Sequence, residues 1–153
     1  MLIERSQIIT TLCDHLRANI PELKLVKPYH GELDRYSKKV QLQENSFPAT
    51  VGLTTPFALI ISKNRQKIDD KGSSVKWKHD ISIYIGDANL HDFTSLDVPP
   101  IFSYMSKCVN VLSGKSLIKG CGALNVISDG EYLITTDQFV VYDQKYYQLE
   151  IGT

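Results

Sequence analysis

The residues from Val75 to Ile85 alternate between two kinds of side chain. A period of two places one set on one face of a β-strand and the other set on the opposite face. This segment predicts a long strand in a sheet with one buried face and one wetter face. The mainly apolar set is Val75, Trp77, His79, Ile81, Ile83 and Ile85, and the polar set is Lys76, Lys78, Asp80, Ser82 and Tyr84.

A second strand is predicted just before it, from Pro56 to Ser62. Its apolar residues occupy both odd- and even-numbered positions (both parities), which is typical of a central strand covered on both faces. The charged residues and Gly72 between Asn64 and Ser74 have the composition of a turn. The two strands are therefore expected to form a hairpin.

Two amphipathic helices are expected to cover this sheet. The first spans Ile3–Asn19 and stops before Pro21, which cannot continue a helix. The second follows Asp97, a potential cap, and ends at Gly114, which suits a left-handed C-cap. The predicted apolar stripes are Ile9, Leu12, Cys13, Leu16 and Ile20 in the first helix and Ile101, Met105, Cys108, Val109 and Leu112 in the second.

The rest of the chain predicts further strands and one polar loop. Residues 30–50 lack apolar periodicity, and loops of this length in compact domains are usually functional arms. Residues 1–153 are predicted to form a single α+β domain, a mostly antiparallel mixed sheet with two helices packed on one face. The additional strands are expected at Leu23–Lys27, Ala123–Ser128, Tyr132–Thr136, Gln138–Tyr142 and Tyr146–Ile151.

The composition of the chain argues against two classes of function, nucleic-acid binding and membrane association. The 17 Lys and Arg residues balance 17 Asp and Glu residues, which argues against sequence-specific nucleic-acid binding driven by phosphate neutralisation. No apolar run approaches the roughly 20 residues that cross a bilayer, so a soluble protein made in a cytoplasm, with no membrane partner, is expected. Cys13, Cys108 and Cys121 are far apart and are expected to be reduced.

Two segments contain fragments of nucleotide-binding motifs. Residues 112–116 match the end of a P-loop, but Val109 stands where that motif needs glycine and the segment follows a helix, so a helix C-cap is the interpretation. Gly120 and Gly122 form half of a dinucleotide fingerprint with no strand leading into it, so a turn is the interpretation. No cofactor is therefore expected.

The histidines and acidic residues form no recognisable active site. No two histidines have the spacing of a metal-binding pair, and His79 is interpreted as a hydrogen-bonded core residue. Glu22 and Lys24 have the Glu-x-Lys spacing of some metal-dependent nucleases, but they precede the hairpin and no suitable acid lies upstream. The chain is predicted to have no catalytic and no metal-binding residues, with a metal-dependent nuclease as the enzymatic alternative.

Three tyrosines, Tyr84, Tyr142 and Tyr146, fall on the more polar parity of their strands. That parity is expected to face away from the helices. Tyrosine is enriched at protein interfaces, because it brings a large contact area at low entropic cost. These residues are therefore predicted to contact another subunit. The alternative is that the rings merely cover a sheet face or rest on cross-strand neighbours.

Five segments, spread over nearly the whole chain, carry a resemblance to a known family. They are Ile20–Leu23 at the end of the first helix, Gly31–Asp34, Thr55–Ile61, Leu112–Leu117 and Phe139–Asp143. In these segments, and in length and order, the chain resembles the bacteriophage tail terminator and Mu-like minor tail protein family. It departs from that family in its long polar stretch before Pro56, which leaves the length of the arm open.

This resemblance implies a structural protein without catalytic residues. Tail terminators are α+β subunits that form a hexameric ring at the head-proximal end of the tail tube, where the ring stops polymerisation and offers a surface for head joining. The implied partners are further copies of the chain, the tail tube protein and a head-completion or neck protein. The implied location is the virion tail, after synthesis in the cytoplasm of the bacterial host.

Contacts between rings are expected in loops, because loops on a rigid scaffold commonly carry docking residues. The candidates are the arm at 30–50 and the turn that contains Lys67, Asp69, Asp70 and Lys71. Two other functions remain open at this point: another phage neck or minor tail protein, and a protein-interaction module of the same fold.

Overall fold

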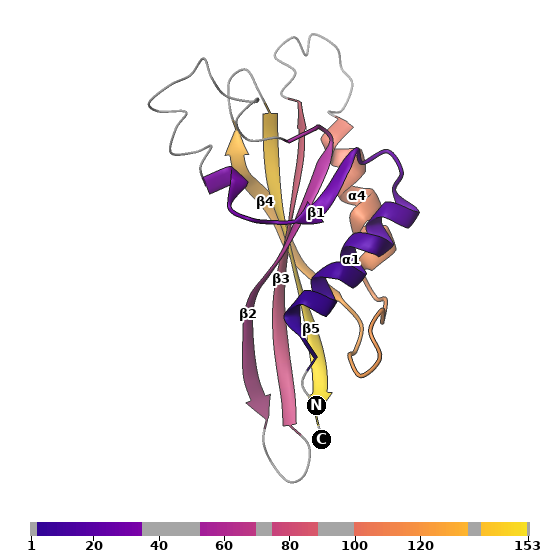
Figure 1. Ribbon diagram of the computed structural model, residues 1–153, viewed down its shortest axis with the longest axis vertical. Helices are drawn as coiled ribbons and strands as arrows, with labels where there is room; N and C mark the ends of the chain where they lie inside the picture. Colours follow the sequence, from indigo (N-terminus) through magenta and orange to yellow (C-terminus); the bar gives the residue numbers. More distant parts are fainter. Residues whose placement is uncertain (1–2, 35–52, 70–74, 89–99, 135–138, 153) are drawn as a thin grey trace.

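The computed structural model describes residues 3–34, 53–69, 75–88, 100–134 and 139–152 (Figure 1). Besides a helical turn at residues 32–34, these ranges hold two helices and five strands. The elements are α1 (Arg5–Asn19), β1 (Leu25–Pro28), β2 (Phe57–Asp69), β3 (Val75–Ala88), α4 (Pro100–Leu112), β4 (Asn125–Ile134) and β5 (Phe139–Gly152).

The five strands form one sheet in the order β1-β2-β3-β5-β4. β1 pairs with β2 in parallel, and all other neighbours are antiparallel. The hairpin of β2 and β3 was expected from the alternating sequence, and it forms the centre of the sheet together with β5. The predicted fold class, an α+β protein with a mostly antiparallel mixed sheet, is confirmed.

Both helices lie on the same face of this sheet, side by side in Figure 1. The stripe of α1 buries Ile8, Leu12, Cys13 and Leu16, close to the predicted set, with Ile8 more deeply buried than Ile9. α4 buries Ile101, Met105, Cys108 and Leu112 against the same core. Among the described residues, no helix is long and apolar enough to span a membrane.

The face away from the helices carries a second, smaller apolar cluster. It consists of Leu33, Phe57, Leu59, Tyr84 and Val141, all of them 3% exposed or less. Leu33 belongs to the helical turn that follows β1, which in Figure 1 crosses to this side of the sheet. The face that was expected to be the wetter one is therefore covered by the chain itself where these five residues lie.

A glycine makes this second cluster possible. Gly86 on β3 is paired with Phe57 on β2. A Cβ atom at residue 86 would lie 2.1 Å from Cζ of the Phe57 ring. The tip of the Phe57 ring therefore occupies the space that a side chain at residue 86 would need.

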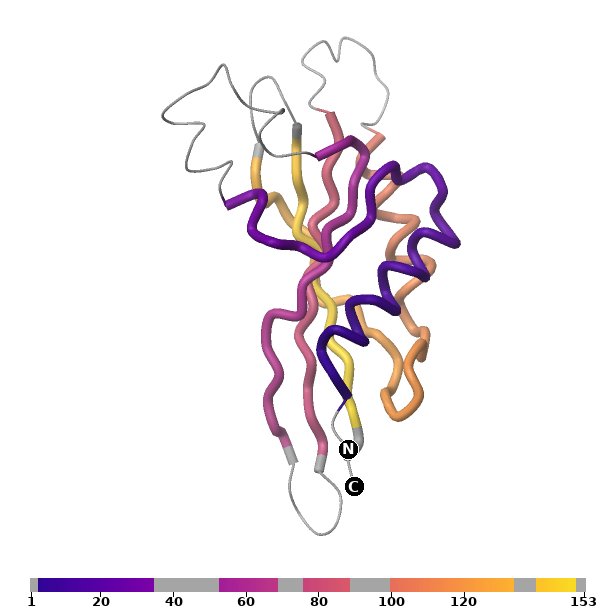
Figure 2. Tube along the Cα trace, viewed as in Figure 1, coloured from indigo at the N-terminus to yellow at the C-terminus, as the bar shows by residue number. Residues whose placement is uncertain are grey.

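The strands are longer than their composition predicts. β2 continues through Asn64 to Asp69, where a turn was expected, because the long β3 pairs with it as far as Lys76. β4 continues through Asp129 and Gly130, also expected to be a turn, because both residues pair with β5. In Figure 2 the lower parts of β2, β3 and β5 extend well beyond β1 and β4.

Candidate functional site

The P-loop-like segment ends a helix, as predicted. α4 ends at Leu112, and Gly114 has a positive φ of 78°. The amide of Gly114 donates to the carbonyl of Leu124, and the amide of Lys115 donates to that of Leu112. Both amides donate hydrogen bonds within the protein and are therefore not free to bind a phosphate. Gly114 serves as a left-handed C-cap of α4.

The three cysteines are free thiols, as expected, and their side chains are buried. Burial raises the pKa of Cys13 to about 11, of Cys108 to about 12 and of Cys121 to about 11. A thiol must lose its proton to act as a nucleophile or a metal ligand. These cysteines are therefore suited to packing.

The residues of the nuclease alternative lie at the surface. Glu22 is exposed and forms an ion pair of 3.3 Å with Lys107 of α4. Its pKa is held below the usual value, first by a backbone hydrogen bond and then by Lys107. In the described part of the chain, no three His, Cys, Asp or Glu side chains are grouped closely enough to hold a metal ion.

His79 lies in the core and is hydrogen-bonded there, as predicted. Its Nε2 lies 2.7 Å from Oε1 of Glu150 on β5, and the two side chains are 0% and 2% exposed. No local pattern indicated that Glu150 would be the partner of His79, because 71 residues separate the two positions. The pair is enclosed, so it has no surface on which to meet a substrate.

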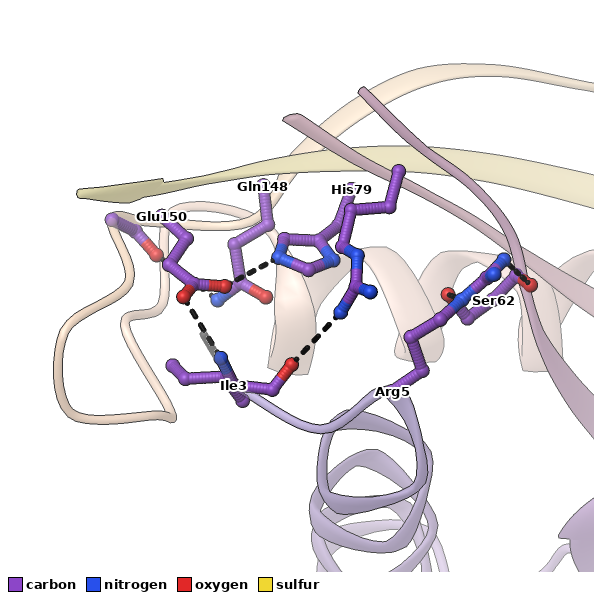
Figure 3. A network of polar contacts seen from close by, with 8 residues as sticks. Ile3, Arg5, Ser62, His79, Gln148 and Glu150 are labelled. Atoms are coloured by element: carbon purple, nitrogen blue, oxygen red, sulfur yellow. Dashed lines mark hydrogen bonds and ion pairs between the residues drawn. The ribbon is translucent and has the colours of Figure 1, made fainter. Parts of the chain in front are cut away.

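The pair belongs to a polar network that holds the start of the chain (Figure 3). The amide of Ile3 donates to Oε2 of Glu150 at 2.9 Å, and the carbonyl of Ile3 accepts from Arg65 of β2 at 3.2 Å. Arg5 donates to the carbonyl of Ser62 at 2.7 Å and to its hydroxyl at 3.0 Å. The network therefore ties the first residues of α1 to β2 and β5.

The three candidate interface tyrosines do not share one face of the sheet, which corrects the prediction. Tyr146 points into the helix-side core with 1% of its surface exposed, and its hydroxyl donates to Gln144. Tyr142 lies on the same side against Phe102 of α4, with ring centroids 5.6 Å apart. The prediction failed because the positions of β5 that face the helices carry buried polar side chains, so their polarity did not indicate an outer face. These side chains are Gln144, Gln148 and Glu150.

Tyr84 does face away from the helices, but it is buried there. Its ring centroid lies 4.9 Å from that of Tyr29 and 4.5 Å from that of Tyr132. Tyr132 donates to Asp34, and Tyr29 accepts from the amide of Asp34. These tyrosines therefore fasten the beginning of the 30–50 segment onto the sheet, so Tyr84 and Tyr146 offer almost no surface to another subunit.

The loop predicted to contact other rings is only partly described. Lys67 and Asp69 belong to the end of β2, whereas Asp70 and Lys71 lie outside the described residues. Of the 30–50 arm, residues 30–34 are described. A role in contacts between rings stays a prediction for both segments.

The sheet has two outer edges that the sequence analysis missed. On β4, the side chains of residues 125–132 are all exposed, including Ile127 at 54% and Val126 at 37%. On β2, β1 pairs only with residues 57–60, so within the described chain no strand covers the outer edge of residues 63–69. Both segments have the composition of turns, so the sequence did not predict that they form the edges of the sheet.

Comparison with known proteins gives a structural match. No protein-family model matches the chain, and no curated protein sequence matches it. Among solved structures, the fold matches a chain from the virion of a native gene transfer agent particle, with a TM-score of 0.66 and 12% sequence identity. The match covers 99% of this chain and 100% of the other, so the two chains share their fold over its whole length.

Proposed function

We propose that this protein is a structural component of a phage-like virion. The observation that carries the proposal is the end-to-end structural match to a chain of a gene transfer agent virion. The buried thiols and the enclosed His79–Glu150 pair also fit a structural role better than a catalytic one.

Within the virion we propose the role of a tail terminator. The support is the resemblance of five sequence segments to that family, together with the matching length and element order. In this role six copies form a ring on the head-proximal end of the tail tube. The partners are then the tail tube protein on one side of the ring and a neck protein on the other.

The physics of tube growth explains why such a protein needs no active site. A tube elongates because each ring offers the next ring the same heterologous surface. Growth stops when a ring binds that surface without reproducing it. Termination therefore requires shape and contact chemistry alone, which suits a chain with a formal net charge of zero.

The proposal is tested by deleting the coding sequence from the genome that produces the particle and imaging the products. A tail terminator predicts tubes of uncontrolled length and filled heads that remain unjoined. Tails of normal length beside unjoined heads would instead indicate a neck protein. Normal joined particles would contradict any assembly role.

A further inference from the structure

The outer edge of β4 carries negative charge on one face. Between its two bulges β4 has a regular stretch at residues 128–131. Asp129 pairs with Gln144, which donates to the Met105 carbonyl of α4, and Glu131 pairs with Tyr142, which also contacts α4. Asp129 and Glu131 therefore lie on the helix side of the sheet. Both are exposed.

The outer edge of β2 carries positive charge on the same face. Its regular stretch between two bulges is residues 64–67. Arg65 pairs with His79, whose side chain lies on the helix side, and Lys67 pairs with Trp77 of the same parity. Arg65 gives one donor to Ile3, but a guanidinium has five N–H donors, so others remain for a partner.

The two edges also have matching directions. β2 is antiparallel to β3, β3 to β5, and β5 to β4, so β4 runs opposite to β2. Within one copy, residues 129–131 of β4 lie level with residues 58–60 of β2, so a second copy must shift along the strands by about seven residues to bring residues 65–67 of its β2 antiparallel to β4 of the first copy. The axis of such a ring is inclined to the strands, as it is in closed β-barrels. The sheets of the two copies would then continue into each other with the helices on one side.

Charge selects this pairing over the others that two copies could make. Like charges directly opposite each other on paired strands are destabilising, and opposite charges are stabilising. Pairing β4 with β4 would oppose Asp129 and Glu131 to their own copies, and pairing β2 with β2 would do the same for Arg65 and Lys67. Of these three pairings, the pairing of β4 with β2 is the one that brings acids opposite bases.

We propose that residues 129–131 of one copy pair, antiparallel, with residues 65–67 of the next copy, so that Asp129 lies opposite Lys67 and Glu131 opposite Arg65. The inference rests on the proposed function, since it names the contact that builds the ring. Such a contact uses two different surfaces, so it is heterologous and closes into a ring when the rotation fits. It also satisfies backbone groups that an open sheet edge leaves without partners.

The test is charge reversal on one edge at a time. One variant carries Asp129→Lys and Glu131→Lys, and the other carries Arg65→Glu and Lys67→Glu. Each variant alone has two edges of the same sign, so each is expected to remain at the monomer mass of 17.3 kDa in native mass spectrometry. Mixed in equal amounts, the two variants have complementary edges at every contact and are expected to form a ring of alternating copies.

A matched control reverses two other exposed lysines, with Lys115→Glu and Lys119→Glu, and is expected to assemble like the wild-type chain. Because Arg65 also contacts Ile3, Lys67→Glu alone is measured too, and circular dichroism verifies the fold of every variant. Folded reversed variants that each assemble alone would overturn this contact, and the proposed function would stand. Reversed variants that stay monomeric when mixed, or a wild-type chain that never self-associates, would also overturn it.

Discussion

The upper half of the sheet is buried on both faces, whereas the lower half is largely polar. In the upper half, where β1 pairs with β2, Phe57 and Leu59 point into one apolar cluster and Ala58 and Ile60 into the other. In the lower half, the helix side holds the His79–Glu150 pair, and the opposite side presents charged residues such as Lys78 and Asp80. The upper half is therefore expected to contribute more to the free energy of unfolding than the lower half.

The largest effect is expected in the upper half, from Phe57→Ala. Removing a fully buried ring leaves a cavity over Gly86, and such substitutions cost about 3–5 kcal/mol of unfolding free energy. Urea denaturation followed by circular dichroism measures the loss. Phe102→Ala on the exposed side of α4 is the control and should cost about 1 kcal/mol or less. Similar losses for the two variants would contradict the two-sided core.

Glu150→Ala tests the polar network of the lower half. It removes the acceptor of both His79 and the Ile3 amide, so the expected loss is about 1–3 kcal/mol. Hydrogen exchange at the Ile3 amide should also become faster, because the first residues lose their tie to β5. Glu22→Ala, which removes an exposed ion pair, is the control and should change little. Unchanged exchange at Ile3 would exclude the tethering role.

Alkaline pH should destabilise the helix-side core through its thiols. Burial raises the pKa of Cys108 from 9.0 to about 12, so above pH 9 the unfolded chain loses this proton while the folded chain keeps it. The stability contributed by the protonated thiol is complete below pH 9 and falls as pH rises toward 12, by about 1.4 kcal/mol per pH unit. Urea titrations between pH 8.5 and about 10 measure the slope. An equal slope in Cys108→Ala would contradict this assignment.

The smallest effect on stability is expected at the far end of β2. Ile68 is 44% exposed, and Ile68→Thr keeps a β-branched side chain that suits a strand. The change in unfolding free energy should stay within about 0.5 kcal/mol. Thermal denaturation at a concentration below self-association checks this. A loss comparable to that of Phe57→Ala would show that the lower half is a core in its own right.

The elements with strong periodicity were predictable from the sequence. The alternation of residues 75–85 identified β3, and the stripes of residues 9–20 and 101–112 identified both helices. The predicted breaks at Asn64 and Asp129 were wrong, because pairing with a long neighbouring strand outweighs the local turn preference of polar residues. The residues of a segment do not indicate which other strand will pair with it.

The candidate surfaces were harder to predict for the same reason. The face that Tyr142 and Tyr146 occupy depends on the register of β5 against β3, and a shift of one residue moves every side chain to the opposite face. The partner of His79 depends on a register between β3 and β5 that no local pattern reveals. The charges of Asp129 and Glu131 were visible in the sequence, but their place on a sheet edge was not.

The central claim is that copies of this chain assemble into a ring. Sedimentation of the purified protein over a wide concentration range tests this most directly, with and without isolated tail tubes. The account predicts a species of six copies of the 17.3 kDa chain, about 104 kDa, in solution or on tube ends. A chain that stays at 17.3 kDa at every concentration, and also fails to bind tube ends, would contradict it.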